Sequence, residues 1–482
     1  MKYIFFILLL GFCHQAYAEL DYFHYQSPFS ARYASEEMSQ IFSLQQRHAC
    51  WRKVWVALAQ AERDLGLPIS DAQVEEMKAA IDTIDFKVAA KYEKELKHDV
   101  MAHVHAYGEQ CPLARPIIHL GATSCTITDN ADQLIMRSAL KLIQSKLKLL
   151  MKNLAMTALH YKDLPCLGYT HFQSAQPTTV GKRMSLWLQD FYLDYLDLAY
   201  RLDHIYFLGV KGTTGTQASF LELFDGDREK VIELEKRFAA QLEYNCTLPV
   251  SGQTYTRKID KQILEVLSGI AVSAHKMSTD LRLLAHLKEI EEPFGKHQVG
   301  SSAMPYKRNP MENERVCSLA RYIMSQANNP QYTAATQWFE RTLDDSANRR
   351  LSIPEAFLAT DTLLDILANI AENMVVYPKV IEKHLDNELP FMATENILMA
   401  CVKKGADRQE IHERIREHSQ LVANKIKNEG AENDLLERLA NDPVISLTRK
   451  EILLIIKDGD FTGCAANQVE NFVNLYIFPI IN

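Results

Sequence analysis

Residues 182–208 read KRMSLWLQDFYLDYLDLAYRLDHIYFL, a run that contains neither glycine nor proline. The absence of both residues, which interrupt helices, predicts one continuous helix. At 1.5 Å per residue such a helix is roughly 40 Å long. Helices of this length exceed the usual length in globular proteins, so the stretch favours a fold that is built on long helices.

Other parts of the chain show the same character. No proline occurs from residue 117 to residue 164, and apolar side chains recur there at helical steps of three or four: Ile135, Ala139, Ile143, Leu147, Leu150 and Leu154. Residues 263–287 and 352–376 also read as long helices, the latter with Pro354 in its first turn. Alternation typical of strands is rare. We therefore predict an all-α fold with a central bundle of long helices.

The chain divides into four segments by pattern. We predict an N-terminal helical domain over residues 19–123, the long-helix bundle over 124–376 and a C-terminal helical domain over 377–482. Residues 1–18 resemble a secretory signal peptide, with Lys2, a short apolar run and a final Ala-Tyr-Ala. The apolar run is too short for a transmembrane helix, and the segment is set aside from the fold.

Composition excludes several classes of protein. The 482 residues are 47% apolar, with only 18 glycines and 16 prolines, which disfavours disorder and turn-rich β folds. A net charge of −8 offers no basic footprint for nucleic acid. Nine cysteines are scattered without a C-x-x-C pair, so neither a zinc framework nor a disulfide scaffold is indicated. Basic clusters must be local, and local cationic clusters suit small anionic ligands.

One such cluster is the stretch GSSAMPYKRNPMENER at residues 300–315. Ser301 is followed there by Lys307, Arg308, Glu314 and Arg315. The serine does not fit the G-x-S-x-G pattern of esterases, because Met304 stands where the second glycine is needed. A solvated surface turn is the alternative interpretation.

Five further stretches break the helical pattern with polar or glycine-containing runs: residues 97–111, 121–124, 168–183, 209–220 and 337–350. The histidines at 98, 103 and 105 could bind a metal, but no H-E-x-x-H is present. A lone histidine such as His171 is more often a buried structural residue.

The combination points to one type of reaction. Removing a proton next to a carboxylate creates a dianionic carbanion, which needs cations and hydrogen-bond donors around it. A general base and a general acid on opposite faces of the substrate then complete an elimination. The histidine, serine, lysine and arginines of these stretches fit that requirement.

GSSAMPYKRNP resembles the G-S-S-x-M-P-x-K-x-N signature of the fumarase/aspartase superfamily. Further motifs resemble the adenylosuccinate lyase family of the animal-like type, from about Tyr25 to the C-terminus: RYAS (32–35), HDVMAHVH (98–105), HLGATS (119–124), THFQ (170–173), GVKGTTGTQASF (209–220), GQTYTRK (252–258) and QWFERTLDDSANRR (337–350).

The resemblance implies a role for each matching residue. Ser301 is expected to be the base on a mobile loop, and Lys307 to hold the substrate carboxylate and stabilise the carbanion. His171 is expected to be the general acid, oriented by Glu314. Positions expected to bind substrate are Arg32, Tyr33, Lys97, His98, Asp99, Thr123, Ser124, Gln253, Arg315, Arg341, Ser346 and Arg350. Lys97 departs from the pattern, which has arginine there. A lysine keeps the positive charge but lacks the paired N–H donors of a guanidinium.

The resemblance also implies an activity and an assembly. The reaction expected is fumarate elimination from adenylosuccinate to give AMP, and from succinylaminoimidazolecarboxamide ribotide in purine synthesis. The expected assembly is a homotetramer with shared sites, with no metal or organic cofactor and no nucleic-acid or membrane partner. A cytoplasmic location is expected, against the signal-like residues 1–18.

Two alternatives stand beside this interpretation. Another fumarate-releasing enzyme of the superfamily, such as an argininosuccinate lyase, would share the serine loop, although the motifs at 32–35 and 337–350 favour a nucleotide substrate. A non-catalytic helical scaffold would keep the fold alone, but the presence of Ser301, His171, Lys307 and Glu314 argues against it.

Overall fold

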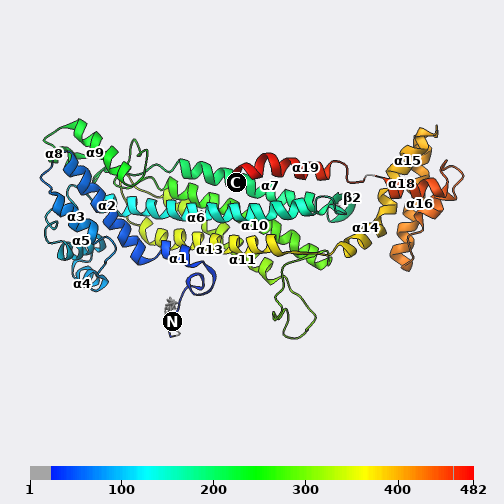
Figure 1. Ribbon diagram of the computed structural model, residues 1–482, viewed down its shortest axis with the longest axis horizontal. Helices are drawn as coiled ribbons and strands as arrows, with labels where there is room; N and C mark the ends of the chain where they lie inside the picture. Colours follow the sequence, from blue (N-terminus) through cyan, green and yellow to red (C-terminus); the bar gives the residue numbers. More distant parts are fainter. Residues whose placement is uncertain (1–22, 460, 482) are drawn as a thin grey trace, which may run out of the picture.

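The computed structural model describes residues 23–459 and 461–481. The signal-like segment, residues 1–18, lies outside the described residues. Within them, a bundle of long helices occupies the centre of the molecule (Figure 1). The bundle helices are α6 (Ser124–His160), α7 (Val180–Asp203), α10 (Lys258–His286), α11 (Met311–Gln326) and α13 (Asp345–Asn373). The predicted all-α fold with a central long-helix bundle is confirmed.

The bundle forms because each long helix has an apolar face. On α6, the predicted stripe is buried: Ile135, Ala139, Ile143, Leu147, Leu150 and Leu154. This face packs against α7 and α13, while α10 packs against α7, α11 and α13. Burial of apolar side chains along the full length of the rods is the main stabilising term.

Several helix limits differ from the prediction; helix α10, for example, begins at Lys258 and not at residue 263. Helix α7 ends at Asp203, before the glycine-free run is complete. Helix α13 begins at Asp345, so Pro354 lies inside the helix and not in its first turn, as the sequence had suggested. A proline inside a helix removes one backbone hydrogen bond. The turns before it are held by the buried ion pairs of Asp345 and Arg349.

Shorter helices gather at one end of the bundle, on the left in Figure 1. They are α2 (Leu44–Asp64), α3 (Asp71–Ala79), α4 (Phe86–Leu96), α5 (Asp99–Gln110), α8 (Ala218–Leu223) and α9 (Arg228–Gln241). Side chains of Ser43, Ser70, Asp85 and His98 accept hydrogen bonds from the first turns of α2 to α5. These caps satisfy amides that a helix start leaves unpaired.

Three further segments flank the long helices: η1, a π-helical turn at Phe29–Tyr33, α1 (Glu36–Ile41) and α12 (Asn328–Ala335). The first of them, η1, packs against α13.

Two small antiparallel sheets lie at the other end of the bundle. Strands β1 (Pro165–Thr170) and β2 (Gln173–Thr179) form a hairpin, and β3 (Ile290–Glu291) pairs with β4 (Val375–Val376). The hairpin was expected only as a polar break between helices.

Beyond the bundle, α14 (Pro378–Met392) leads to a smaller helical unit with its own buried core. This unit comprises α15 (Thr394–Lys403), α16 (Arg408–Glu429), α17 (Leu435–Ala440) and α18 (Arg449–Asp458).

The chain then returns to the bundle as α19 (Ala465–Phe472), η2 (Val473–Ile477) and α20 (Phe478–Ile481), and packs on α6 and α7. The domain limits at residues 123 and 376 stay predictions. Among the helices of the described ranges, none combines the length and the apolar character that crossing a membrane requires.

Candidate active site

The N-terminal ends of α5, α6 and α13 meet at one place. His98 caps α5 through Nδ1, which accepts a hydrogen bond from the Met101 amide at 3.3 Å. This assigns the proton to Nε2, which lies 3.4 Å from Ser124 Oγ at the start of α6. Asp99 accepts a hydrogen bond from Arg350 of α13 at 2.8 Å.

The charge on Asp99 is held by these neighbours. Burial opposes its ionisation, but hydrogen bonds from Arg350 and from the Val100 amide outweigh burial, so the pKa of Asp99 lies below its ordinary value. The carboxylate therefore stays charged near neutral pH. One guanidinium face of Arg350, itself half exposed, remains open to a ligand.

The loop before α10 joins the same place. The side chain of Gln253 donates from Nε2 to Thr123 Oγ1 at 3.4 Å. The backbone N–H of Gln253 donates to the Glu340 carbonyl at 3.1 Å. A Cβ on Gly252 would lie 2.6 Å from that carbonyl, so only glycine permits this approach. Arg341 follows directly and pairs with Asp345 at 2.9 Å.

Nine of the predicted substrate-binding residues thus lie at or beside these helix ends. This helix-end group consists of Lys97, His98, Asp99, Thr123, Ser124, Gln253, Arg341, Ser346 and Arg350. Lys97 ends α4 in a left-handed conformation with φ 55° and is exposed. Paired arginines and amide-rich helix starts are suited to phosphate and carboxylate groups.

Ser301 lies elsewhere, on the serine loop, residues 292–310, which joins β3 to α11 (yellow-green in Figure 1). Its Oγ accepts a hydrogen bond from the Met304 amide at 3.2 Å. Asn309 donates to the Gly300 carbonyl at 2.8 Å, which closes the loop on itself. Lys307 is exposed on the same loop.

Glu292 anchors the C-terminal end of the serine loop, a function that the sequence reasoning missed. Its buried carboxylate accepts from the Glu312 and Asn313 amides, each at 3.0 Å, at the start of α11. Burial raises its pKa although these amides favour the charged form. No local signal identified it, because twenty residues separate Glu292 from Glu312. Arg308 also reaches Glu291 and Tyr377, each at 3.4 Å.

Arg32, Tyr33 and Arg315 form a second small cluster. The guanidinium of Arg315 lies 5.9 Å from the ring centre of Tyr33, and that of Arg32 lies 5.8 Å from the same ring. The contact places η1 against α11. Glu314 is exposed on the first turn of α11.

His171 occupies the tip of the β1–β2 hairpin. Thr170 pairs with Gln173, so His171 and Phe172 form a two-residue turn with φ values of 52° and 56°. Left-handed conformations cost non-glycine residues roughly 1–2 kcal/mol each. Strain of this kind is often retained where a side chain must project in a fixed direction. Both side chains are exposed.

The helix-end group and the hairpin tip do not meet within a single chain. Ser124 begins α6, whereas His171 follows the far end of that helix. A helix of 37 residues is about 55 Å long. In the part of the chain that the structure describes, no hydrogen bond or ion pair joins the helix-end group, the serine loop and the hairpin tip.

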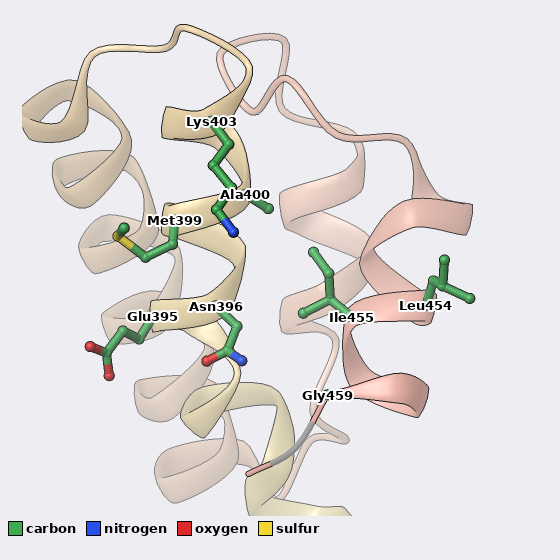
Figure 2. Close-up of a pocket in the computed structure, with 8 residues that line it drawn as sticks. All are labelled: Glu395, Asn396, Met399, Ala400, Lys403, Leu454, Ile455 and Gly459. Carbon is green, nitrogen blue, oxygen red and sulfur yellow. The ribbon is translucent and has the colours of Figure 1, made fainter. Parts of the chain in front are cut away.

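A separate hollow lies in the C-terminal unit between α15 and α18 (Figure 2). Its lining is partly apolar: Glu395, Asn396, Met399, Ala400, Lys403, Leu454, Ile455 and Gly459. None of the predicted site residues lines it.

Comparison with known proteins bears on the class of this chain. The family model described as Lyase matches residues 25–325, and that described as Adenylosuccinate lyase C-terminus matches residues 390–472. Adenylosuccinate lyases of Saccharomyces cerevisiae and Schizosaccharomyces pombe are each 53% identical, over 94% of this chain and 95% of theirs. That of Schistosoma mansoni is 46% identical over 96% of this chain and 97% of its own.

Solved structures agree on the fold. The 3-carboxy-cis,cis-muconate lactonizing enzyme from Pseudomonas putida gives a TM-score of 0.82 at 24% identity, covering 94% of this chain and 99% of that one. The fumarate lyase from Mesorhizobium sp. BNC1 gives 0.79 at 22% identity, covering 94% and 100%. At these identities the likeness concerns the fold alone.

The long-helix fold and the match to the Lyase model define a carbon–nitrogen lyase of the fumarase/aspartase superfamily. Within that class, the chain belongs to the adenylosuccinate lyase family.

Proposed function

We propose that this chain eliminates fumarate from adenylosuccinate, leaving AMP, and from succinylaminoimidazolecarboxamide ribotide in de novo purine synthesis. The observation that carries the activity is the 53% identity to yeast adenylosuccinate lyases along nearly the whole chain. The residues expected to perform the chemistry are all present in that frame: Ser301, Lys307, His171 and Glu314.

In the proposed mechanism Ser301, as an oxyanion, takes a proton from the methylene carbon of the succinyl group. The electron pair passes into the neighbouring carboxylate and then forms the double bond of fumarate. As it does so, the bond between the other carbon and the nitrogen breaks, and His171 gives its proton to the departing nitrogen. The Met304 amide, 3.2 Å from Ser301 Oγ, and the cation of Lys307 favour the charged forms.

We further propose that the site is completed by several subunits of a homotetramer. The length of α6 supports this, because roughly 55 Å of helix separate Ser124, at its start, from the end that leads into the hairpin with His171. A substrate that touches both must receive them from different chains. Glu314, exposed on α11, is then free to orient the His171 of a neighbouring chain.

The surface of the bundle supports the same assembly. Large apolar side chains remain exposed along α7 and α10: Leu186, Leu193, Leu196, Tyr200, Val272 and Leu283. On α7, steps of seven, three and four keep them on one side of the helix. Rows of exposed apolar side chains typically mark contact surfaces between proteins, and here the partner is another copy of the chain.

We place the enzyme in the cytoplasm, where its nucleotide substrates occur, with small nucleotides as partners rather than nucleic acid or membrane. Mass spectrometry of the native N-terminus would test this placement. A mature chain that begins after Ala18 would contradict it.

The activity is tested by fumarate release from the purified full chain. We expect release from adenylosuccinate and none from argininosuccinate. Release from argininosuccinate alone would indicate another lyase of the superfamily. No release from either substrate would favour a non-catalytic scaffold.

A further inference from the structure

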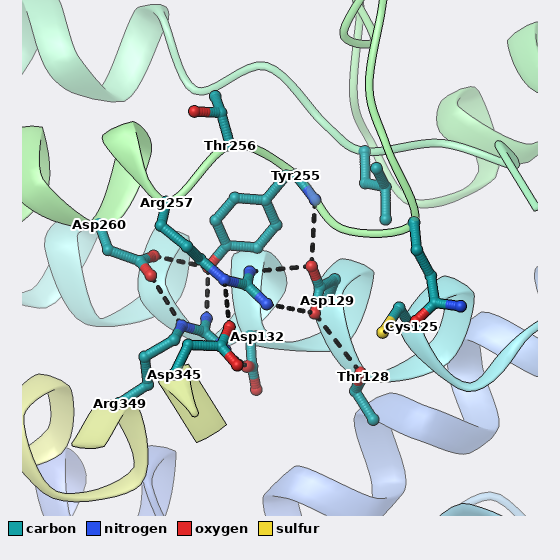
Figure 3. A network of polar contacts seen from close by, with 12 residues as sticks. Cys125, Thr128, Asp129, Asp132, Tyr255, Thr256, Arg257, Asp260, Asp345 and Arg349 are labelled. Atoms are coloured by element: carbon teal, nitrogen blue, oxygen red, sulfur yellow. Dashed lines mark hydrogen bonds and ion pairs between the residues drawn. The ribbon is translucent and has the colours of Figure 1, made fainter. Parts of the chain in front are cut away.

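We infer that Asp345 is a positioning residue, which fixes the guanidinium of Arg341 for an anionic group of the substrate. The inference rests on the proposed function, since it takes Arg341 to be a substrate-binding residue. Its basis is a buried network of ion pairs around Asp129, Arg257 and Asp345 (Figure 3).

Asp345 bridges two guanidinium groups. Its carboxylate is fully buried, with Oδ1 2.9 Å from Arg341 Nη1 and Oδ2 2.6 Å from Arg257 Nε. Arg341 is only partly buried, at 22% exposure, and so reaches from the network towards the surface of the site. A guanidinium has five N–H donors, so this bond leaves most of them for a ligand.

Arg257 is itself fixed on its other side. Its Nη1 and Nη2 lie 2.9 Å and 3.3 Å from the two oxygens of Asp129, which makes a two-point pair. Asp129 also accepts from the Tyr255 amide at 3.1 Å. The pairs therefore tie together α6, the loop before α10 and the start of α13, and these segments carry most of the helix-end group.

A second arm of the network stiffens the start of α13. Arg349 lies 2.7 Å from Asp260 and 3.1 Å from Asp132, and the Tyr255 hydroxyl donates to Asp260 at 2.6 Å. The two arms contain four carboxylates, those of Asp129, Asp132, Asp260 and Asp345, and two guanidiniums, those of Arg257 and Arg349. The guanidinium of Arg47 also lies 3.9 Å from Asp132. With Arg47 counted, one carboxylate remains in excess, and the guanidinium of Arg341 beside Asp345 balances it.

This arrangement has a kinetic consequence. A guanidinium binds a carboxylate or phosphate through two parallel hydrogen bonds only when the guanidinium plane is held in the correct orientation. An interaction made equally in the ground state and the transition state changes KM and leaves kcat nearly constant. Loss of Asp345 should therefore act mainly on KM, through Arg341.

The first test is Asp345→Asn, which removes the charge and keeps the shape. We expect KM for adenylosuccinate to rise about 10-fold or more, with a smaller change in kcat. The matched control is Asp344→Asn, at the adjacent exposed carboxylate, whose side chain makes no capping hydrogen bond. It makes the same change in net charge and should leave KM near the wild-type value.

The second test separates positioning from general structural support. Asp345→Asn is added to Arg341→Ala, and KM is compared across the four proteins. If Asp345 acts through Arg341, it adds little in the Arg341→Ala background. An equal rise of KM in both backgrounds would overturn the inference. If Asp345→Asn does not fold, Asp345→Glu keeps the charge, displaces the carboxylate by one methylene group and should show the same non-additivity.

Wild-type turnover keeps the two hypotheses distinct. If the wild type releases no fumarate from adenylosuccinate, the proposed function is wrong. If it does, and KM of Asp345→Asn stays within about twofold of wild type, only the inference about Asp345 is wrong.

Discussion

At the scale of single residues, the role proposed for Ser301 is the most demanding. A serine hydroxyl holds its proton tightly, so it acts as a base only when its oxyanion is stabilised. The Met304 amide lies 3.2 Å from its Oγ, and Lys307 follows on the same loop. These groups would stabilise the charged form of Ser301.

Ser301→Ala should therefore abolish turnover and leave substrate binding nearly unchanged, because the base acts in the transition state. We expect kcat to fall at least 10²-fold, about 3 kcal/mol in the barrier. Steady-state rates and equilibrium binding of adenylosuccinate check both parts. Ser302→Ala, an exposed neighbour, is the control. Activity of Ser301→Ala within a few-fold of wild type would exclude it as the base.

A pair of stacked histidines, His48 on α2 and His103 on α5, makes the stability of the protein depend on pH. The rings of His48 and His103 lie 3.9 Å apart beside Trp51. Burial lowers the pKa of His48 to about 4 and that of His103 to about 3. In the unfolded chain, the pKa of each histidine is about 6.5. Their contribution to stability is thus complete above about pH 6.5 and is lost as pH falls towards the folded-state pKa values, because the unfolded chain binds more protons.

His103→Phe should weaken this pH dependence. The substitution keeps a stacked ring but cannot bind a proton, so the slope of unfolding free energy should fall by at most about 1.4 kcal/mol per pH unit. Urea unfolding followed by tryptophan fluorescence, between about pH 5 and about pH 7, measures the slope. His160→Phe, at an exposed ring, should leave it unchanged. Equal slopes in wild type and His103→Phe would contradict the prediction.

At the scale of elements, the shape of the serine loop depends on Gly300. A Cβ at this position would lie 2.2 Å from the Lys307 carbonyl, closer than any real contact. The loop can fold back, with Ser301 and Lys307 on one short segment, only because that Cβ is missing. Glu292 fixes the point at which the loop enters α11.

Gly300→Ala should open the loop and lower kcat at least 10-fold, because the base and the cation lose their mutual placement. Gly295→Ala on the same loop is the control, since its Cβ would meet the Gln298 side chain at an ordinary 3.6 Å. Steady-state kinetics of both variants with adenylosuccinate measure the difference. Equal losses in the two variants would show that the loop is sensitive to any added methyl group, and no loss in either would show that it tolerates the displacement. Both outcomes would contradict the prediction.

The sequence predicts elements well where their signal is local. An apolar stripe predicts α6, and the absence of glycine and proline predicts α7. Helix α11 was not predicted as a long helix. The start of α13 could not be predicted from local sequence. The charged side chains of Asp345 and Arg349 are buried there because they pair with Arg257 and Asp260, which lie 88 and 89 residues earlier. The hairpin at residues 165–179 was missed because its exposed polar side chains do not alternate with a buried face over its whole length.

The candidate site divides in the same manner. Its residue types could be predicted from motifs in order along the chain, and nine of them do lie together at the helix ends. The residues that support the site could not be predicted. Asp129, beside the helix-end group, and Glu292, at the serine loop, both act through partners that are distant in the sequence. Which groups would meet across subunits in the proposed assembly is also beyond any local pattern.

At the scale of the whole molecule, α6 is a rod that separates two sets of functional residues. The helix-end group lies at its start, and the hairpin with His171 lies past its end (Figure 1). Rod-like helices pack readily across symmetric bundles. Antiparallel packing of two such rods would bring the start of one beside the end of the other, and a complete site would then need more than one chain.

Two inactive variants should therefore rescue each other. His171→Ala and Ser301→Ala are each expected to be inactive alone. After dissociation, mixing in equal amounts and reassembly, a site needs an intact histidine from one chain and an intact serine from another. With random assembly each condition holds half the time, so roughly a quarter of the sites should be whole and about that fraction of wild-type activity should return. Differently tagged chains that co-purify show that mixed assemblies have formed, and each variant dissociated and reassembled alone is the control. Mixed assemblies that stay inactive would mean that His171 and Ser301 act within one chain.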